Sequence, residues 1–173
     1  MEIKQAGPDK YEEIRAFYHA LIDAIEDLPY GAGWKKDIYP SREMLRDAAE
    51  AGELFAATEE GSVIGAMVVN HQCNEGYKEF DWPTKAEDAE VTVIHALGVD
   101  PAYSGKGVAK AMVRFVIDTA RENGQKVIRL DVLKGNLPAE KLYEGLGFVH
   151  QHTLKMFYAD TGWTDYELYE YGL

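Results

Sequence analysis

The residues with the clearest capacity for chemistry form a turn with almost no side chain, Ser104-Gly105-Lys106-Gly107. An apolar run ending at Val99 precedes the turn, and a helical pattern follows it. Backbone N–H groups at a helix start are free, and the helix dipole adds partial positive charge. Glycine lacks the Cβ that would keep an anion away, and Lys106 and Lys110 add charge. The pattern favours a phosphate or pyrophosphate site. The alternative is a tight connection whose glycines serve only backbone geometry.

Two well-known phosphate motifs do not account for this turn. No Gly-Lys-Ser or Gly-Lys-Thr ending is present, which excludes a P-loop. No G-x-G-x-x-G with a distant acid on a strand supports a dinucleotide site. A second informative segment lies downstream: IRLDVLKGNLPAEKLYEGLGF, residues 128–148, contains Asn136, Leu142-Tyr143-Glu144 and Gly147-Phe148.

Together with LGVDPAYSGKGVAKAMV, residues 97–113, this segment resembles the GNAT superfamily of acyl-CoA-dependent N-acyltransferases. The family signature in the turn is Arg or Gln, two residues, Gly, one residue, and Gly or Ala. Gly107 and Ala109 match this signature, whereas Ser104 departs from Arg or Gln and weakens one side-chain contribution. The resemblance is sharp over residues 91–149 and compatible in element order elsewhere.

The resemblance implies that acetyl-CoA, as acyl-donor cosubstrate, lies in a splay between the strands at 91–99 and 126–133. Its pyrophosphate would lie on the N–H groups of residues 104–109, and its pantetheine arm would pair with the end of the first strand as an added strand does. Asn136 and Ala139 would contact the arm from the other side. The implied donor-binding residues are Leu97, Gly98, Val99, Ser104, Gly105, Lys106, Gly107, Val108, Ala109, Asn136, Ala139 and Tyr143.

Transfer of an acyl group from a thioester to an amine makes three demands. The amine must be neutral, although a lysine-like amine has a pKa of about 10.4. The developing oxyanion needs a donor, for which a backbone N–H near Leu97 or Val99 is the candidate. The leaving thiolate benefits from a proton. The resemblance places Tyr143 beside the sulfur, which makes it the candidate general acid, with an ordinary core tyrosine as the alternative.

The general base is less clear from the residues. Many relatives carry a glutamate on the first of the two strands, at the position that Val93 occupies here. His95 lies two residues on, hence on the same strand face, and an unperturbed pKa near 6.5 makes it a candidate base. A satisfied core histidine is the alternative. Glu90 and Asp88, at the start of the strand, are candidates to act through water or are ordinary solvated charges.

Other reactive side chains carry less information. Cys73 has only His71 nearby to activate it, so we interpret it as a spectator thiol. His150 and His152 share a strand face and have no evident third ligand, so no metal is expected.

For the acceptor, the expected walls are Tyr30, Trp34, Tyr39 and the segment 71–90, which holds six acids against two lysines. Aromatic and acidic side chains suit a cationic amine, and Tyr30, Trp34 and Glu90 are the candidate substrate-binding residues. A solvated loop with local aromatic packing, or a dimer contact, is the alternative. Polyamine, amino sugar, amino acid and peptide N-terminus all remain open as acceptors.

Hydrophobic periodicity and turn residues predict the elements that must position these groups. Asp9 and Glu12 suggest a capping box before the first helix, Ser41 is expected to cap the second, and Gly52 to end it. Expected strands span 2–5, 53–58, 62–70, 91–99, 126–133, 148–158 and 164–169, and expected helices span 10–26, 41–52, 107–123 and 138–145. The order predicts an α/β (α+β) fold. With the resemblance, this is a single GNAT-like domain over residues 1–173. Its mixed, mostly antiparallel sheet of about seven strands is splayed between strands 4 and 5, with helices on both faces.

Bulk properties narrow the class of protein. The chain of 173 residues carries a net charge of −12, which argues against a nucleic-acid partner. Its apolar runs are too short to span a membrane, and MEIKQAG lacks the profile of a signal peptide, so we expect a cytoplasmic protein. A homodimer is possible, because the tyrosine-rich end, residues 165–173, would either complete the sheet or meet a second subunit.

The leading hypothesis is therefore an N-acetyltransferase that moves an acetyl group from acetyl-CoA to a primary amine of a small molecule or peptide. The attack would be direct, in a ternary complex, with Tyr143 as acid and His95 as a possible base. The alternative, motivated by Val93 and Ser104, is an acyl-CoA-binding regulatory or scaffold module without turnover.

Overall fold

Seven strands form one sheet in the computed structural model, which describes residues 1–173. They are β1 (Glu2–Gln5), β2 (Leu54–Glu59), β3 (Ser62–Asn70), β4 (Val91–Val99), β5 (Val127–Leu133), β6 (Val149–Tyr158) and β7 (Gly162–Gly172). Their order across the sheet is β1-β2-β3-β4-β5-β7-β6. Neighbours are antiparallel except β4 and β5, which are parallel. The predicted mixed, mostly antiparallel sheet is confirmed.

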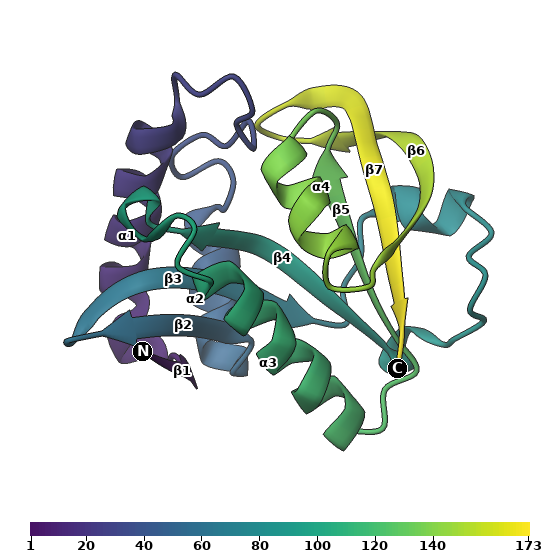
Figure 1. Cartoon of the computed structure of the whole chain (residues 1–173), viewed down its shortest axis with the longest axis horizontal. Coiled ribbons are helices and arrows are strands. Elements are labelled where there is room, and N and C mark those ends of the chain that lie inside the picture. The colour runs from purple at the N-terminus through teal and green to yellow at the C-terminus, as the bar shows by residue number, and fades with distance from the viewer.

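Helices cover both faces of this sheet (Figure 1). They are α1 (Tyr11–Ile25), α2 (Arg42–Ala51), α3 (Val108–Glu122) and α4 (Leu137–Glu144). The buried faces of α1 and α2 form one hydrophobic cluster with β2 and β3, and those of α3 and α4 form another on the opposite side of the sheet. Short 3-10 turns span Pro8–Lys10, Glu75–Glu79, Asp88–Glu90 and Pro101–Tyr103.

Local capping explains where the helices begin and end. The Ser41 hydroxyl accepts the N–H of Met44 at 3.0 Å, and Gly52 ends α2 in the left-handed conformation with φ 75°, both as expected. The expected capping box at Asp9 is wrong. A 3-10 turn runs directly into α1, so Lys10 occupies the cap position and no side chain caps the helix.

The sheet opens between β4 and β5. The two strands pair only at Val91–Val127, Thr92–Ile128 and Val93–Arg129. Beyond Val93 they diverge, and the rest of β4 has no ladder partner on that side. The helix α3 connects the two strands as the crossover that a parallel pair requires. The predicted splay therefore exposes a strand edge inside the sheet.

A bulge bends β4 at the level of the splay. Val68 of β3 lies opposite His95 and Ala66 lies opposite Gly98, so Ala96 and Leu97 together face one residue of β3. Ala96 takes the positive φ of 51°, and its carbonyl accepts the Tyr18 hydroxyl of α1 at 2.8 Å. The bulge re-aims the backbone that follows it toward the opening.

The far end of the sheet is closed by the C-terminal strand and the segment 71–90. Strand β7 lies between β5 and β6, so the tyrosine-rich end completes the sheet. A buried Arg129–Glu170 ion pair at 3.0 Å, with the Arg129 guanidinium over the Trp82 ring at 4.4 Å, holds the segment 71–90 against β5 and β7. No helix is long and apolar enough to cross a membrane.

Candidate active site

The opening between β4 and β5 leads into a cleft of about 530 Å³. Its walls are the end of β4, the turn before α3, the start of α4 and the loop after α1. The residues along it that were expected to bind the donor are Leu97, Gly98, Val99, Ser104, Gly105, Gly107, Val108, Ala109, Asn136, Ala139 and Tyr143. The structure thus brings together eleven of the twelve side chains or backbone positions in that set.

The turn before α3 presents free hydrogen-bond donors to this cleft. The N–H groups of Gly105, Gly107, Val108, Ala109 and Lys110 have no acceptor within the protein. Those of Ser104 and Lys106 already bond to the carbonyls of Pro101 and Tyr103, so they are not available as the sequence suggested. A run of free N–H groups at the N-terminus of a long helix is the arrangement that binds a phosphate.

Both the backbone conformation and the open space above the turn favour glycine at positions 105 and 107. Gly105 and Gly107 have φ of 73° and 83°, which disfavours any other residue. A Cβ added at either position would meet nothing within 4 Å, so no protein atom fills the space above them. The turn therefore fits a bound diphosphate, and backbone geometry alone also requires its glycines.

Lysine 106 is the expected donor-binding residue that the structure places elsewhere. Its Nζ lies 4.6 Å from the centre of the Tyr103 ring, and its side chain does not line the cleft. Lys110, one helical turn further, lines the cleft instead and supplies positive charge there.

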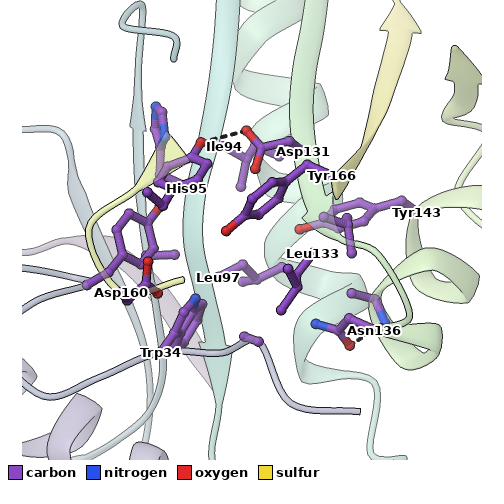
Figure 2. Close-up of a pocket in the computed structure, with 16 residues that line it drawn as sticks. Trp34, Ile94, His95, Leu97, Asp131, Leu133, Asn136, Tyr143, Asp160 and Tyr166 are labelled. Atoms are coloured by element: carbon purple, nitrogen blue, oxygen red, sulfur yellow. Dashed lines mark hydrogen bonds between the residues drawn. The ribbon is translucent and has the colours of Figure 1, made fainter. Parts of the chain in front are cut away.

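Behind this cleft lies a second, smaller cavity of about 80 Å³ (Figure 2). The two cavities share six lining residues, which are Ala32, Trp34, Leu97, Asn136, Ala139 and Tyr143. A group carried at the inner end of the first cleft therefore reaches the mouth of the second.

Tyr143 stands at this junction. Its ring is buried between Phe148 and Tyr169, at centroid distances of 5.4 Å and 6.4 Å. Its hydroxyl makes no hydrogen bond within the protein. Every fully buried polar side-chain atom has a hydrogen-bond partner. The unpaired Tyr143 hydroxyl is therefore not fully buried, and it is accessible from the cavity. Burial raises the pKa of Tyr143 well above its ordinary value, with a smaller contribution from Asp131, so the phenol keeps its proton.

Asp131 on β5 contributes a carboxylate to the cavity and is not among the site residues expected from the sequence. Its Oδ2 accepts two phenolic hydroxyls, from Tyr77 at 2.8 Å and from Tyr158 at 2.7 Å. Its Oδ1 has no partner and is therefore open to the cavity (Figure 2). Burial raises the pKa of Asp131 to about 6, against the opposing effect of the two tyrosines.

His95 lies on β4 beside the same cavity. Its Nε2 is 2.9 Å from Oδ1 of Asn70, so this nitrogen is engaged away from the cavity's carboxylate. Burial lowers the pKa of His95 to about 4. This effect outweighs a hydrogen bond with the Gln72 backbone, which by itself raises the pKa. The ring is neutral at neutral pH and is a weaker base than Asp131.

The remaining walls of the cavity are aromatic. Trp34 and Tyr39 come from the loop after α1, and Tyr158 and Tyr166 come from the β6–β7 hairpin. Tyr39 and Tyr158 pack edge to face with centroids 5.5 Å apart, and Tyr158 and Tyr166 lie 4.9 Å apart. Asp160, in the turn of the hairpin, adds a second buried carboxylate.

The expected substrate-binding residues separate in space. Trp34 lies at the junction of the two cavities, whereas Tyr30 is 48% exposed and lines only the larger cleft. Glu90 lies apart from both, in a different cleft, where it pairs with Lys126 at 2.8 Å and caps a 3-10 turn. Of the segment 71–90, Tyr77 reaches the site through Asp131.

One signal in the sequence points to Asp131. In VIRLDVL the two charged residues, Arg129 and Asp131, alternate on one face of a strand that is otherwise apolar, and a buried acid is informative. Arg129 pairs with Glu170 and not with Asp131, which leaves Asp131 without a cation. No comparable signal marks Asp160 or the tyrosines of the hairpin, which only the fold brings to the site.

Comparison with known proteins identifies the class. The model of the acetyltransferase (GNAT) family matches residues 16–148, which is more than half of the chain. The chain belongs to the GNAT family of acetyltransferases.

Individual relatives agree with this assignment. The mycothiol acetyltransferase of Thermomonospora curvata is 29% identical over 125 residues, 72% of this chain and 37% of that protein. The chain spans 33% to 40% of the length of the first curated relatives. A GNAT-family acetyltransferase structure from Streptococcus agalactiae matches with a TM-score of 0.82 at 18% identity, over 99% of this chain and 95% of that one. An acetyltransferase of Salmonella typhimurium, solved with its cofactor acetyl-CoA, matches with a TM-score of 0.71 at 20% identity, over 100% and 94%. At these identities the structures support the fold.

Proposed function

We propose that this chain is an N-acetyltransferase that transfers an acetyl group from acetyl-CoA to a primary amine within a ternary complex. The observation that carries the proposal is the junction at Tyr143. There a cleft with free N–H donors and an unpaired strand edge meets a small cavity containing a carboxylate. Family membership supports acetyl-CoA as the donor.

The donor's parts match the cleft in order. The diphosphate lies on the N–H groups of Gly105, Gly107, Val108 and Ala109, with Lys110 nearby. The pantetheine arm pairs with the free edge of β4 after Val93, as an added strand does. Asn136 caps α4 by accepting the Ala139 N–H at 3.5 Å, and both residues line the opposite wall. The thioester then lies beside Tyr143.

The acceptor amine enters the smaller cavity and meets Asp131. An ammonium group first pairs with the ionised carboxylate and loses one proton to solvent. The neutral nitrogen then attacks the thioester carbon, and Asp131 Oδ1 takes the second proton as the new bond raises the acidity of the nitrogen. In many relatives a glutamate of the neighbouring strand stands at the position of Val93. Here β5 supplies the carboxylate, two residues beyond the Arg129 that pairs with Val93.

The leaving group departs on the other side of the carbonyl. As the carbon–nitrogen bond forms and the carbon–sulfur bond breaks, the thiolate of CoA receives a proton from the Tyr143 hydroxyl. The phenolate regains its proton from solvent. The net reaction converts a primary ammonium and acetyl-CoA into an acetamide, CoA thiol and one released proton.

Two measurements test this function. Calorimetric titration with acetyl-CoA, with ATP and NAD as controls, should show tight binding of acetyl-CoA alone. Release of CoA thiol in the presence of an amine panel should then reveal turnover. Binding without thiol release from any amine would support the alternative, a regulatory acyl-CoA-binding module, and absence of binding by folded protein would refute both.

A further inference from the structure

The acceptor cavity contains two carboxylates and no counter-charge. Asp160 is 6% exposed, and its Oδ1 accepts the N–H of Thr161 at 3.0 Å. Its hydrogen bonds come only from backbone N–H groups, those of Thr161 and of Asp160 itself, and its side chain lines the cavity, as that of Asp131 does. No Lys, Arg or His nitrogen lies within 4.0 Å of either carboxylate, and Lys35 acts on Asp160 only from a distance. Buried charges are normally paired with an opposite charge. These two carboxylates have no such partner within the protein, which leaves room for a cationic ligand.

The two carboxylates stand at different places along the cavity. Asp131 projects from β5 beside Ile94 and Tyr166, and Asp160 comes from the turn between β6 and β7 near Trp34 (Figure 2). Tyr39 and Tyr166 line the same cavity as both carboxylates. Aromatic faces between two anionic ends are suited to an aliphatic chain that carries a cation at each end.

We propose that the acceptor is a short alkyl diamine, whose reacting amine lies at Asp131 while its second ammonium binds Asp160. This inference rests on the proposed acetyl transfer and names its substrate class. The cavity of about 80 Å³ has room for roughly six atoms of water size, by the volume that one water requires. A slender chain of four carbons with two terminal nitrogens has that size.

The chemistry consumes one amine and leaves the other. The nitrogen at Asp131 forms the amide bond as the carbon–sulfur bond breaks, with its protons passing to Asp131 and solvent. The ammonium at Asp160 keeps its proton and its charge. The product is a mono-acetylated diamine of one positive charge, which retains the Asp160 contact and has lost the contact with Asp131.

Matched amines test the second site. We would measure kcat/KM by thiol release for putrescine, for butylamine, which lacks the second amine, and for aminobutanol, whose second group is neutral. The full chain should prefer putrescine over both others by at least about tenfold, the range expected for a charge-assisted contact. Propane and pentane diamines would report which length matches the spacing of the carboxylates.

The Asp160→Asn variant assigns the preference to its residue. It should reduce the ratio of kcat/KM for putrescine over butylamine toward one. Asp165→Asn is the matched control, because Asp165 lies on the same hairpin, pairs with Lys134 at 3.6 Å and does not line the cavity. The control should keep the full ratio.

The outcomes separate the two proposals. Equal kcat/KM for putrescine and butylamine, or a ratio that survives in Asp160→Asn, would overturn the diamine assignment and leave acetyl transfer intact. Turnover of other amines with none of the diamines would do the same. Thiol release from no amine at all would overturn the transferase proposal together with this one.

Discussion

At the scale of single residues, burial shifts the pKa values of Asp131 and His95 in the acceptor cavity in opposite directions. It raises the pKa of Asp131 to about 6 and lowers the pKa of His95 to about 4, because in each case it disfavours the charged form. At neutral pH the carboxylate is ionised and the imidazole is neutral. A general base works best when its pKa lies near the working pH, which favours Asp131.

This assignment predicts the acid side of the pH profile. In the wild-type chain kcat/KM should fall below a midpoint near pH 6, because protonated Asp131 cannot accept a proton. Asp131→Asn should lower kcat/KM by about 10²- to 10⁴-fold and remove this limb. Initial rates between pH 5 and 9 would measure both. If His95→Gln removes the limb and Asp131→Asn retains it, the base is the histidine.

The same raised pKa predicts a pH-dependent stability. The folded protein binds a proton at Asp131 more readily than the unfolded chain, so stability falls as pH rises from about 4 through about 6. Above that range the buried charge costs at most about 3 kcal/mol. Asp131→Asn should therefore melt above wild type at pH 8, and the difference should shrink at pH 4. A difference in melting temperature that is the same at both pH values would contradict this account.

Tyr143 makes a separate prediction for the leaving group. Tyr143→Phe should lower kcat by about 10²-fold or more with little change in KM for acetyl-CoA, because the hydroxyl acts on the departing sulfur. The deficit should shrink with an acetyl thioester whose thiol is more acidic. Tyr171→Phe is the control, since its hydroxyl bonds Arg121 on the surface of α3. A Tyr143→Phe variant with full kcat would remove the acid from the mechanism.

At the scale of elements, two glycines at the ends of α3 allow the effect of backbone strain to be distinguished from the effect on ligand binding. Gly107 and Gly124 lie at opposite ends of α3, both with positive φ and with open space where a Cβ would be. Substituting either by alanine should cost about 1 kcal/mol of stability. Gly107→Ala should also raise KM for acetyl-CoA, because its methyl group enters the diphosphate site. Gly124→Ala should leave KM unchanged, and equal KM values for the two variants would argue against the site.

Helices and strands were the most predictable part of the molecule. Apolar periodicity placed every strand and helix, and β4 began and ended where expected, at residues 91 and 99. The error at Asp9 arose because the capping pattern carries no information on a preceding 3-10 turn. The bulge at Ala96 was also not predicted, because it depends on the register between β3 and β4.

The donor side of the site followed from local sequence, whereas the acceptor side did not. The turn and the α4 start are contiguous segments whose chemistry is visible in order along the chain. The acceptor cavity instead combines β5, the loop after α1 and the β6–β7 hairpin, so Asp131, Tyr158 and Asp160 meet only through the sheet order. Glu90 shows the converse. It directly precedes β4 in the sequence and was therefore expected at the site, but the structure places it in a different cleft.

At the scale of the whole molecule, donor binding should stabilise the fold measurably. A ligand at one hundred times its Kd adds about 2.7 kcal/mol, which for a chain of this size corresponds to roughly 5–10 °C in melting temperature. Scanning calorimetry with increasing concentrations of acetyl-CoA would measure this shift. Adenosine, which lacks the diphosphate and the pantetheine arm, is the control. The shift should be smaller in Gly107→Ala than in Gly124→Ala.

Sedimentation would test the homodimer, which stays a prediction.

The opening between β4 and β5 leaves an unpaired edge on β4 after Val93 and another on β5 after Arg129, in addition to the two outer edges that any open sheet has. The outer edges are β1, a strand of four residues, and β6, whereas the inner edge of β4 lies in a mostly apolar wall of the cleft. Unpaired edges of this kind recruit strands from other chains and lead to aggregation. The pantetheine arm would then act as a plug as well as a reactant, and the solubility of the newly made chain would depend on the supply of CoA in its surroundings.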